Sequence, residues 1–245
     1  MGVPANVRTA KALTAKTLAA GVAGCAAIVI AGCGGSGSTS GSASAPPKEP
    51  SSTALLTAMQ SSVRQASSVH VAGNLSNNGT PISVDLDLRR NGDVSGTVSQ
   101  NAAPFQVVGL GNLTYIKATR AFLQEVKAPT SACAVVCGKW LQLTTAEAGQ
   151  LTGDLSMSSL TAPLTSGKVP ALAEAGKVTV NGQSAWVLRA SDGSKLDVST
   201  TSQHYPLAAS TGGSAHEVVT YSKWNAAPKP VAPPANEVLN LNNLK

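Results

Sequence analysis

The chain contains 245 residues, of which 42% are hydrophobic, 12% charged and 3% aromatic, and its formal net charge is +6. This length is ample for one hydrophobic core and favours a single folded domain. Basic residues do not cluster with aromatic ones, so the composition excludes a nucleic-acid-binding surface.

The first 32 residues have the order of an export signal. Arg8, Lys11 and Lys16 form a positive head, and residues 18–30 follow without a charge. The apolar stretch is about 13 residues long, whereas a membrane-spanning helix needs about 20. We therefore interpret residues 1–32 as a signal peptide that is removed, which lowers the formal net charge from +6 to +3.

The signal ends in the run Ile30-Ala31-Gly32-Cys33, which resembles the lipobox of bacterial lipoproteins. Two small residues before a cysteine give a peptidase access to a thiol that already carries diacylglycerol. The alternative cysteine, Cys25, would leave only about five apolar residues before it, fewer than the roughly 7 to 15 expected. We therefore predict that Cys33 is the lipid anchor and that the exported protein lies on the outer face of the cell membrane.

The segment after the anchor indicates a tether. Residues 34–45 are almost entirely Gly, Ser, Ala and Thr, and Pro46, Pro47 and Pro50 close the stretch. Such a composition cannot bury enough apolar surface to fold. Residues 33–50 are thus predicted to be a flexible tether with a root-mean-square reach of roughly 20 to 25 Å.

Two cysteines remain in the body, and an even pair in an exported protein favours a disulfide between Cys133 and Cys137. In a strand, residues four apart lie about 13 Å apart, which exceeds the roughly 4.4 to 6.8 Å that a disulfide permits. The segment should therefore form a turn or a single helical turn. Free buried thiols are the alternative, whereas a metal site would need further ligands and no histidine lies near.

The folded body begins with a helix that Ser51 or Ser52 can cap. Its apolar stripe comprises Leu55, Leu56, Met59, Val63 and Ala66. The apolar period then changes to two, which indicates a strand with one buried face at Ile82, Val84, Leu86 and Leu88. Asn91-Gly92 is a strong hairpin signal, and residues 93–100 are predicted to form the partner strand.

Further strands are predicted at residues 104–110, 113–118, 140–143, 177–180, 185–190, 194–200, 206–210 and 216–224. Helical segments interrupt them near Glu147 and between residues 151 and 172. About nine or ten strands and two helical regions result, without the alternation of strand and helix that a parallel sheet requires. We therefore predict an α+β fold in one domain: a curved antiparallel sheet, or half-barrel, wrapped over helices.

Several segments together carry a resemblance to a known family. They are the closing strand at residues 218–225, the segment 201–207 with its proline, and the pairs Ala227-Pro228 and Pro233-Pro234. With the lipobox, they resemble actinobacterial envelope lipoproteins of the mycobacterial LppX and LprG family, which is related in fold to the lipoprotein carriers LolA and LolB. The segment 133–172 departs from the family pattern.

The resemblance implies a LolA-like half-open β-barrel whose concave face and covering helix enclose an apolar cavity for acyl chains. Residues 51–226 would form this lipid-binding domain, and residues 227–245 a proline-rich strap. Within the strap, four apolar residues are expected to dock back on the body: Val238, Leu239, Leu241 and Leu244.

Aromatic residues are scarce, so the wall of such a cavity would be aliphatic, which suits flexible acyl chains. The candidate wall residues are Leu55, Leu56, Met59, Val63, Val84, Leu86, Leu88 and Val107. The same residues fit a closed core equally well. In that case the body would be a non-catalytic interaction, accessory or sensor domain of an envelope complex.

The sequence contains no nucleophile elbow, phosphate loop or zinc signature. Its three histidines, His70, His204 and His216, fall near predicted strand ends and turns. We therefore expect no enzymatic activity, no metal and no cofactor. The expected partners are the membrane, through the N-terminal diacylglycerol, and an acyl lipid or glycolipid bound by a monomer.

Overall fold

Twelve strands form one curved sheet in the computed structural model, which describes residues 50–240 except 78, 153, 167–172 and 214–216. The strand order is β12-β6-β5-β4-β3-β2-β1-β11-β10-β9-β8-β7, so the sheet has two free edges and does not close into a barrel. The predicted signal peptide, Cys33 and nearly all of the tether lie outside the described residues, as do Leu241 and Leu244.

The strands are β1 Ser68–Asn77, β2 Thr80–Arg89, β3 Val94–Gln100, β4 Ala103–Leu110, β5 Leu113–Ala118, β6 Trp140–Thr144, β7 Ala173–Val180, β8 Gln183–Arg189, β9 Lys195–Ser199, β10 Pro206–Ser210, β11 Val218–Ser222 and β12 Val238–Asn240. The helices are α1 Ser52–Gln65, α2 Arg120–Glu125, α3 Ala132–Val136, α4 Thr145–Thr152, α5 Met157–Thr165 and the short 3-10 helix η2 Ala235–Glu237. The predicted α+β fold with a half-barrel sheet is confirmed.

The alternation predicted for the second strand sets the two faces of the sheet. Val84, Leu86 and Leu88 of β2 are buried on the concave face, whereas Asp85 is exposed on the opposite face. The turn after β2 contains Gly92 at φ 92°, a conformation that glycine adopts without strain. From this turn β3 returns in antiparallel register, with Val98 opposite Val84.

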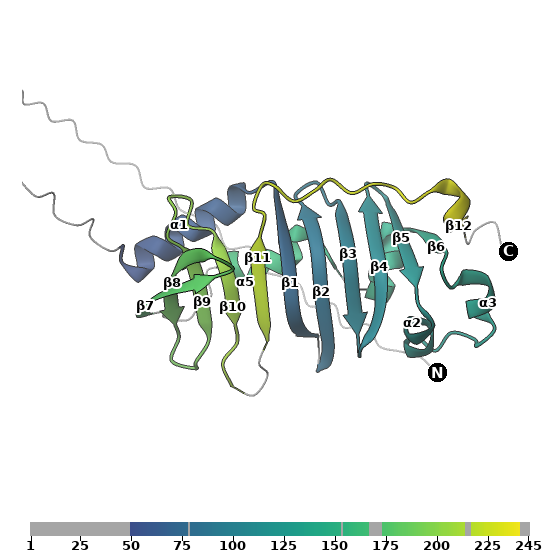
Figure 1. Ribbon diagram of the computed structural model, residues 1–245, viewed down its shortest axis with the longest axis horizontal. Coiled ribbons are helices and arrows are strands. Elements are labelled where there is room, and N and C mark those ends of the chain that lie inside the picture. The colour runs from purple at the N-terminus through teal and green to yellow at the C-terminus, as the bar shows by residue number, and fades with distance from the viewer. Residues whose placement is uncertain (1–49, 78, 153, 167–172, 214–216, 241–245) are drawn as a thin grey trace, which may run out of the picture. The chain divides into compact units, whose positions relative to one another are not determined.

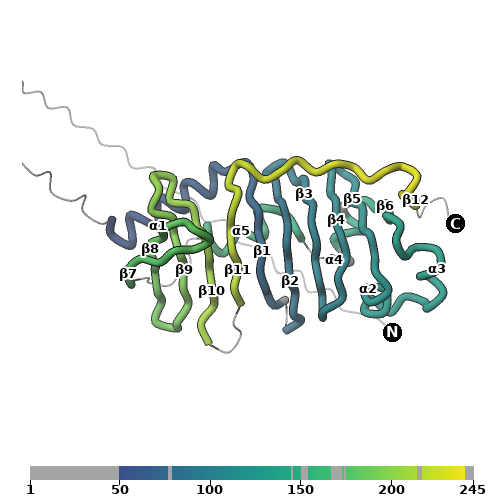
Figure 2. Tube along the Cα trace, in the orientation of Figure 1, coloured from purple at the N-terminus to yellow at the C-terminus, as the bar shows by residue number. Residues whose placement is uncertain are grey.

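Helices α1, α4 and α5 lie against one face of the sheet (Figures 1 and 2). The side chain of Ser51 caps α1 by accepting a hydrogen bond from the backbone N–H of Ala54. The buried side of α1 consists of Leu55, Met59 and Val63, as the stripe in the sequence predicts. Within the described ranges, every helix falls short of the length and apolar character needed to cross a bilayer.

Three features differ from the sequence prediction. The sheet has more strands than the nine or ten expected, and helix α2 was not foreseen. The sheet is antiparallel as predicted except at one edge, where β12 runs parallel to β6 and Leu239 lies opposite Leu141. The cause is the route of the chain, which leaves β11 in the middle of the sheet and crosses the strand ends before it reaches β6 (Figure 1).

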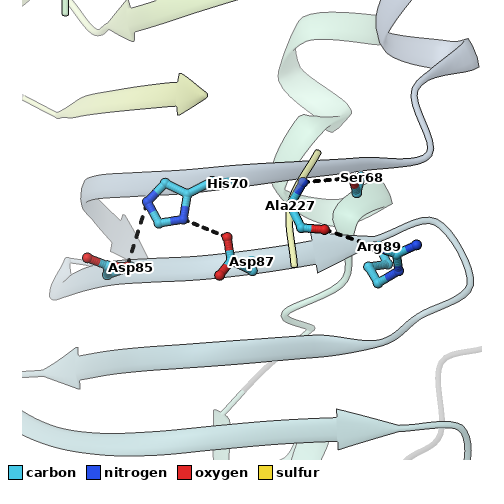
Figure 3. A network of polar contacts seen from close by, with 6 residues as sticks. All are labelled: Ser68, His70, Asp85, Asp87, Arg89 and Ala227. Atoms are coloured by element: carbon cyan, nitrogen blue, oxygen red, sulfur yellow. Dashed lines mark hydrogen bonds and ion pairs between the residues drawn. The ribbon is translucent and has the colours of Figure 1, made fainter. Parts of the chain in front are cut away.

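The crossing segment, residues 227–237, is the first part of the predicted strap 227–245 and is held at both ends. At its start, the backbone of Ala227 donates to Ser68 Oγ at 3.2 Å and accepts from Arg89 Nη1 at 2.9 Å (Figure 3). At its far end, Lys117 Nζ lies 3.3 Å from Glu237 Oε2. Leu239 packs against the core, so the expected docking of Val238 and Leu239 through β12 is confirmed.

The hydrogen bond from Arg89 to the carbonyl of Ala227 leads to a prediction about stability. Arg89→Met keeps much of the apolar stem but removes the charge-assisted hydrogen bond, so it should lower the free energy of unfolding by about 1.5 kcal/mol. Lys229→Met, at an exposed position of the strap, is the control and should change little. Urea unfolding of both variants measures the difference. Equal stability of the two variants would contradict a clamping role for Arg89.

Candidate functional site

A pocket of about 440 Å³ lies between α5 and strands β1, β9, β10 and β11 on the concave side; we call it the α5 pocket. Its position follows from the alternation of the strands, since Val71 of β1 and Val219 and Tyr221 of β11 face the helices. The lining residues are Val71, Leu75, Ser159, Leu160, Pro163, Leu164, Ser166, Ser194, Lys195, Leu196, Ala209, Ser210, Thr211, Glu217, Val219 and Tyr221.

The wall of the pocket is divided by polarity. Aliphatic side chains from β1, β9, β11 and α5 form the interior, whereas Ser194, Lys195, Thr211 and Glu217 stand where β9 begins, β10 ends and β11 begins. These positions share one end of the antiparallel sheet. Lys195 Nζ is 3.3 Å from the carboxylate of Asp197, which compensates its charge. The pocket thus suits a molecule with an apolar chain and a polar end.

Tyr221 supplies an aromatic part of the wall. Burial raises the pKa of its phenol to about 12, because the phenolate is poorly solvated inside the protein. The ring of Trp224 stacks on it at 6.0 Å between centroids and on Tyr205 at 4.8 Å. Trp224 Nε1 donates to the carbonyl of Pro206 at 3.0 Å, which fixes the stack at the β10–β11 side of the pocket.

A cluster of His70, Asp85 and Asp87 lies on the outer face of the sheet, opposite the α5 pocket. His70 is adjacent in sequence to the pocket residue Val71, so its side chain points away from the pocket. His70 Nδ1 is 2.8 Å from Asp87 Oδ1, and Nε2 is 3.7 Å from Asp85 Oδ1 (Figure 3). These contacts tie β1 to β2 and contribute nothing to the chemistry of the α5 pocket.

The cavity residues predicted from the sequence occupy other parts of the concave side. The buried ones are Leu55, Met59, Val63, Val84, Leu86, Leu88 and Val107, and Leu56 is half-buried. Val63 borders a separate hollow of about 250 Å³, and Val107 borders another of about 400 Å³ under α4. None of the eight, all of which the structure describes, borders the α5 pocket. Their role in a lipid cavity stays a prediction.

Some residues that line the α5 pocket, such as Leu196 and Val219, lie in strands that the sequence predicts, whereas Val71 and Leu75 belong to β1, which was not among the predicted strands. Leu196 and Val219 carry the same alternation as their buried neighbours. A further signal is Pro163 within an apolar segment, because proline removes a backbone hydrogen bond from a helix.

The two cysteines of the body are joined in a disulfide with 4.7 Å between their Cα atoms. Helix α3, a single turn, brings them together as the spacing predicts. Across the described residues, no cluster of three or more His, Cys, Asp or Glu side chains could hold a metal ion.

Several solved structures match this chain. LprF from Mycobacterium bovis matches with a TM-score of 0.51 and 16% identity over 75% of this chain and 95% of LprF. The lipoprotein LppX from Mycobacterium tuberculosis matches with a TM-score of 0.43 and 20% identity over 71% of this chain and 97% of LppX. A chain of the MucA/MucB complex from Pseudomonas aeruginosa matches with a TM-score of 0.30 and 17% identity over 74% of this chain and 58% of that chain.

No protein-family model and no curated protein matches the sequence. The likeness to LprF shows the architecture of the half-barrel, and the resemblance expected from the sequence is therefore confirmed at the level of the fold.

The raised pKa of Tyr221 predicts a pH dependence of stability. Because the folded value is about 12 and the ordinary value is 10.0, ionisation above pH 10 favours the unfolded chain. The contribution of the neutral Tyr221 phenol to the free energy of unfolding is fully present below pH 10 and is lost as the pH rises to about 12. At pH 11 the wild type should lose about 1.4 kcal/mol of unfolding free energy that Tyr221→Phe does not lose.

Chemical denaturation of both proteins at pH 8 and pH 11 measures this loss. The comparison at pH 8 corrects for any constant effect of removing the hydroxyl. An identical loss in the two proteins between these pH values would contradict the assignment to Tyr221.

Proposed function

We propose that the protein binds an acyl chain of a lipid or glycolipid in the α5 pocket and carries or presents that lipid in the cell envelope, as a monomer and without catalysis. The observation that carries the proposal is an aliphatic pocket of about 440 Å³ on the concave side of a half-barrel with the fold of LprF. The polar residues at one end of the pocket, including Ser194 and Thr211, provide a place for a head group.

The energetics favour an acyl chain over a compact polar ligand. Each buried methylene contributes about 0.8 kcal/mol, so about ten of them contribute roughly 8 kcal/mol before the entropic costs of binding. Since Lys195 is already paired with Asp197, the polar end offers the hydroxyl groups of Ser194 and Thr211 and the carboxylate of Glu217 rather than a free cation. Flexible aliphatic ligands gain most from such a wall.

The alternative of a non-catalytic interaction or sensor domain also has an observation in its favour. Leu86, Leu88 and Met59 are 0% exposed, so the middle of the concave side is a packed core. The α5 pocket lies beside this core, so the test of the proposal addresses that pocket.

Two tryptophan substitutions on one strand separate these functions. Ala209 lines the α5 pocket, whereas Ala208 of the same strand faces the other side of the sheet, opposite Asp197. Ala209→Trp should fill the pocket and reduce copurifying acyl lipids at least about tenfold, and Ala208→Trp should leave them unchanged. Mass spectrometry of organic extracts from the purified proteins measures the lipid. Wild-type protein without acyl lipids, or with lipids that both variants retain equally, would contradict the proposal.

We further propose that residues 1–32 are removed, that Cys33 carries diacylglycerol, and that residues 33–50 tether the domain 51–226 and its strap 227–245 to the outer face of the membrane. The support is the lipobox in the sequence. The structure describes none of residues 1–49, so this part rests on the sequence alone. Within tether's reach, the pocket can exchange lipid with the bilayer.

Cys33→Ala should block lipoprotein processing and release the protein from the membrane pellet. Fractionation of cells with detection of the chain measures its location, and mass spectrometry of the N-terminus measures the processing. Cys25→Ala is the matched control, and it should leave the location unchanged. A protein that stays in the pellet after Cys33→Ala, with the same processed N-terminus, would contradict the anchor.

A further inference from the structure

The connection between β5 and β6 is far longer than the turn requires. These strands are antiparallel neighbours, and such a hairpin needs only 2 to 5 residues. Here residues 119–139 intervene and form helices α2 and α3. We call residues 120–139 the knob; Figure 1 shows it at the β6 end of the sheet, away from the strands that form the α5 pocket.

The disulfide holds an apolar side chain of the knob in solvent. Helix α3 has five residues, too few to be stable alone, and the bond between Cys133 and Cys137 fixes its single turn. Within that turn Val136 is buried against the core, whereas Val135 is 56% exposed. Val126, which ends α2, is also among the exposed large hydrophobic residues at 37%.

The charges of the knob are mostly positive. Arg120, Lys127 and Lys139 are exposed, and no ion pair involves them in the described part of the chain. The one acidic residue of the knob is Glu125, whose Oε1 accepts a hydrogen bond from Asn101 Nδ2 at 2.6 Å. Lys127 has φ 55°, a conformation uncommon for lysine that marks the exposed turn after α2.

We propose that the knob is a membrane-contact site, in which Val135 and Val126 enter the head-group region of an anionic lipid surface and Lys127 and Lys139 face its phosphates. Two exposed valines are too small an area for a stable protein interface, which buries about 1,000 Å² or more. A lipid surface needs no matching shape, and each cation near it strengthens binding by about fivefold. This contact is independent of whether the α5 pocket holds a lipid.

Hydrogen–deuterium exchange of the full chain tests the proposal because it reports each segment separately. Vesicles of phosphatidylcholine mixed with phosphatidylglycerol should slow exchange in residues 126–139, and pure phosphatidylcholine should slow it much less. The double variant Lys127→Glu with Lys139→Glu should need at least about 25 times the vesicle concentration to reach the same protection. Val135→Asp should also weaken it.

Val178→Asp is the matched control, since Val178 is 37% exposed on β7 at the other edge of the sheet. This variant should keep the protection of the knob. Protection that is equal on neutral vesicles, absent from residues 126–139, or unaffected by the knob variants would overturn the proposal. Lipid copurification with the α5 pocket is a separate measurement, so failure of either proposal is recognised on its own.

Discussion

The structure depends on one constraint: the apolar concave face of a twelve-stranded sheet must be kept from water by a few short helices. Helix α1 covers its part with a regular stripe. Helix α5 has nine residues and contains Pro163, and the guanidinium of Arg64 holds its end by a 3.0 Å hydrogen bond to the carbonyl of Thr165. The α5 pocket lies between this short helix and strands β1, β9, β10 and β11.

Local sequence patterns predicted much of the fold. The period of two in β2 placed Val84 and Leu86 inside, and the stripe of α1 identified Leu55 as buried. The four-residue spacing of the cysteines required a helical turn, which α3 provides. Each of these inferences depends only on residues close in sequence, where backbone periodicity and bond geometry decide the outcome.

The candidate site was harder to predict from the sequence, because a pocket is formed by residues that lie far apart in the chain. Leu88 and Leu196 have equal apolar character, yet Leu88 is enclosed in the core and Leu196 faces the pocket beside α5. The strap presents the same difficulty. The contact of Arg89 with Ala227 joins residues 138 apart, and no local pattern announces it. Periodicity identifies the buried face of a strand but not the gaps within it.

An open half-barrel must also protect its edges, since unpaired strand edges recruit other chains. At one edge the short β12 pairs with β6, so the strap first crosses the sheet and then supplies its last strand. At the other, β7 carries a register shift between Glu174 and Lys177, and Lys177 Nζ lies 3.9 Å from the ring centroid of Trp186. A bulge and a charged side chain both disfavour edge pairing. These features therefore disfavour pairing of the free edges of the open sheet with other chains.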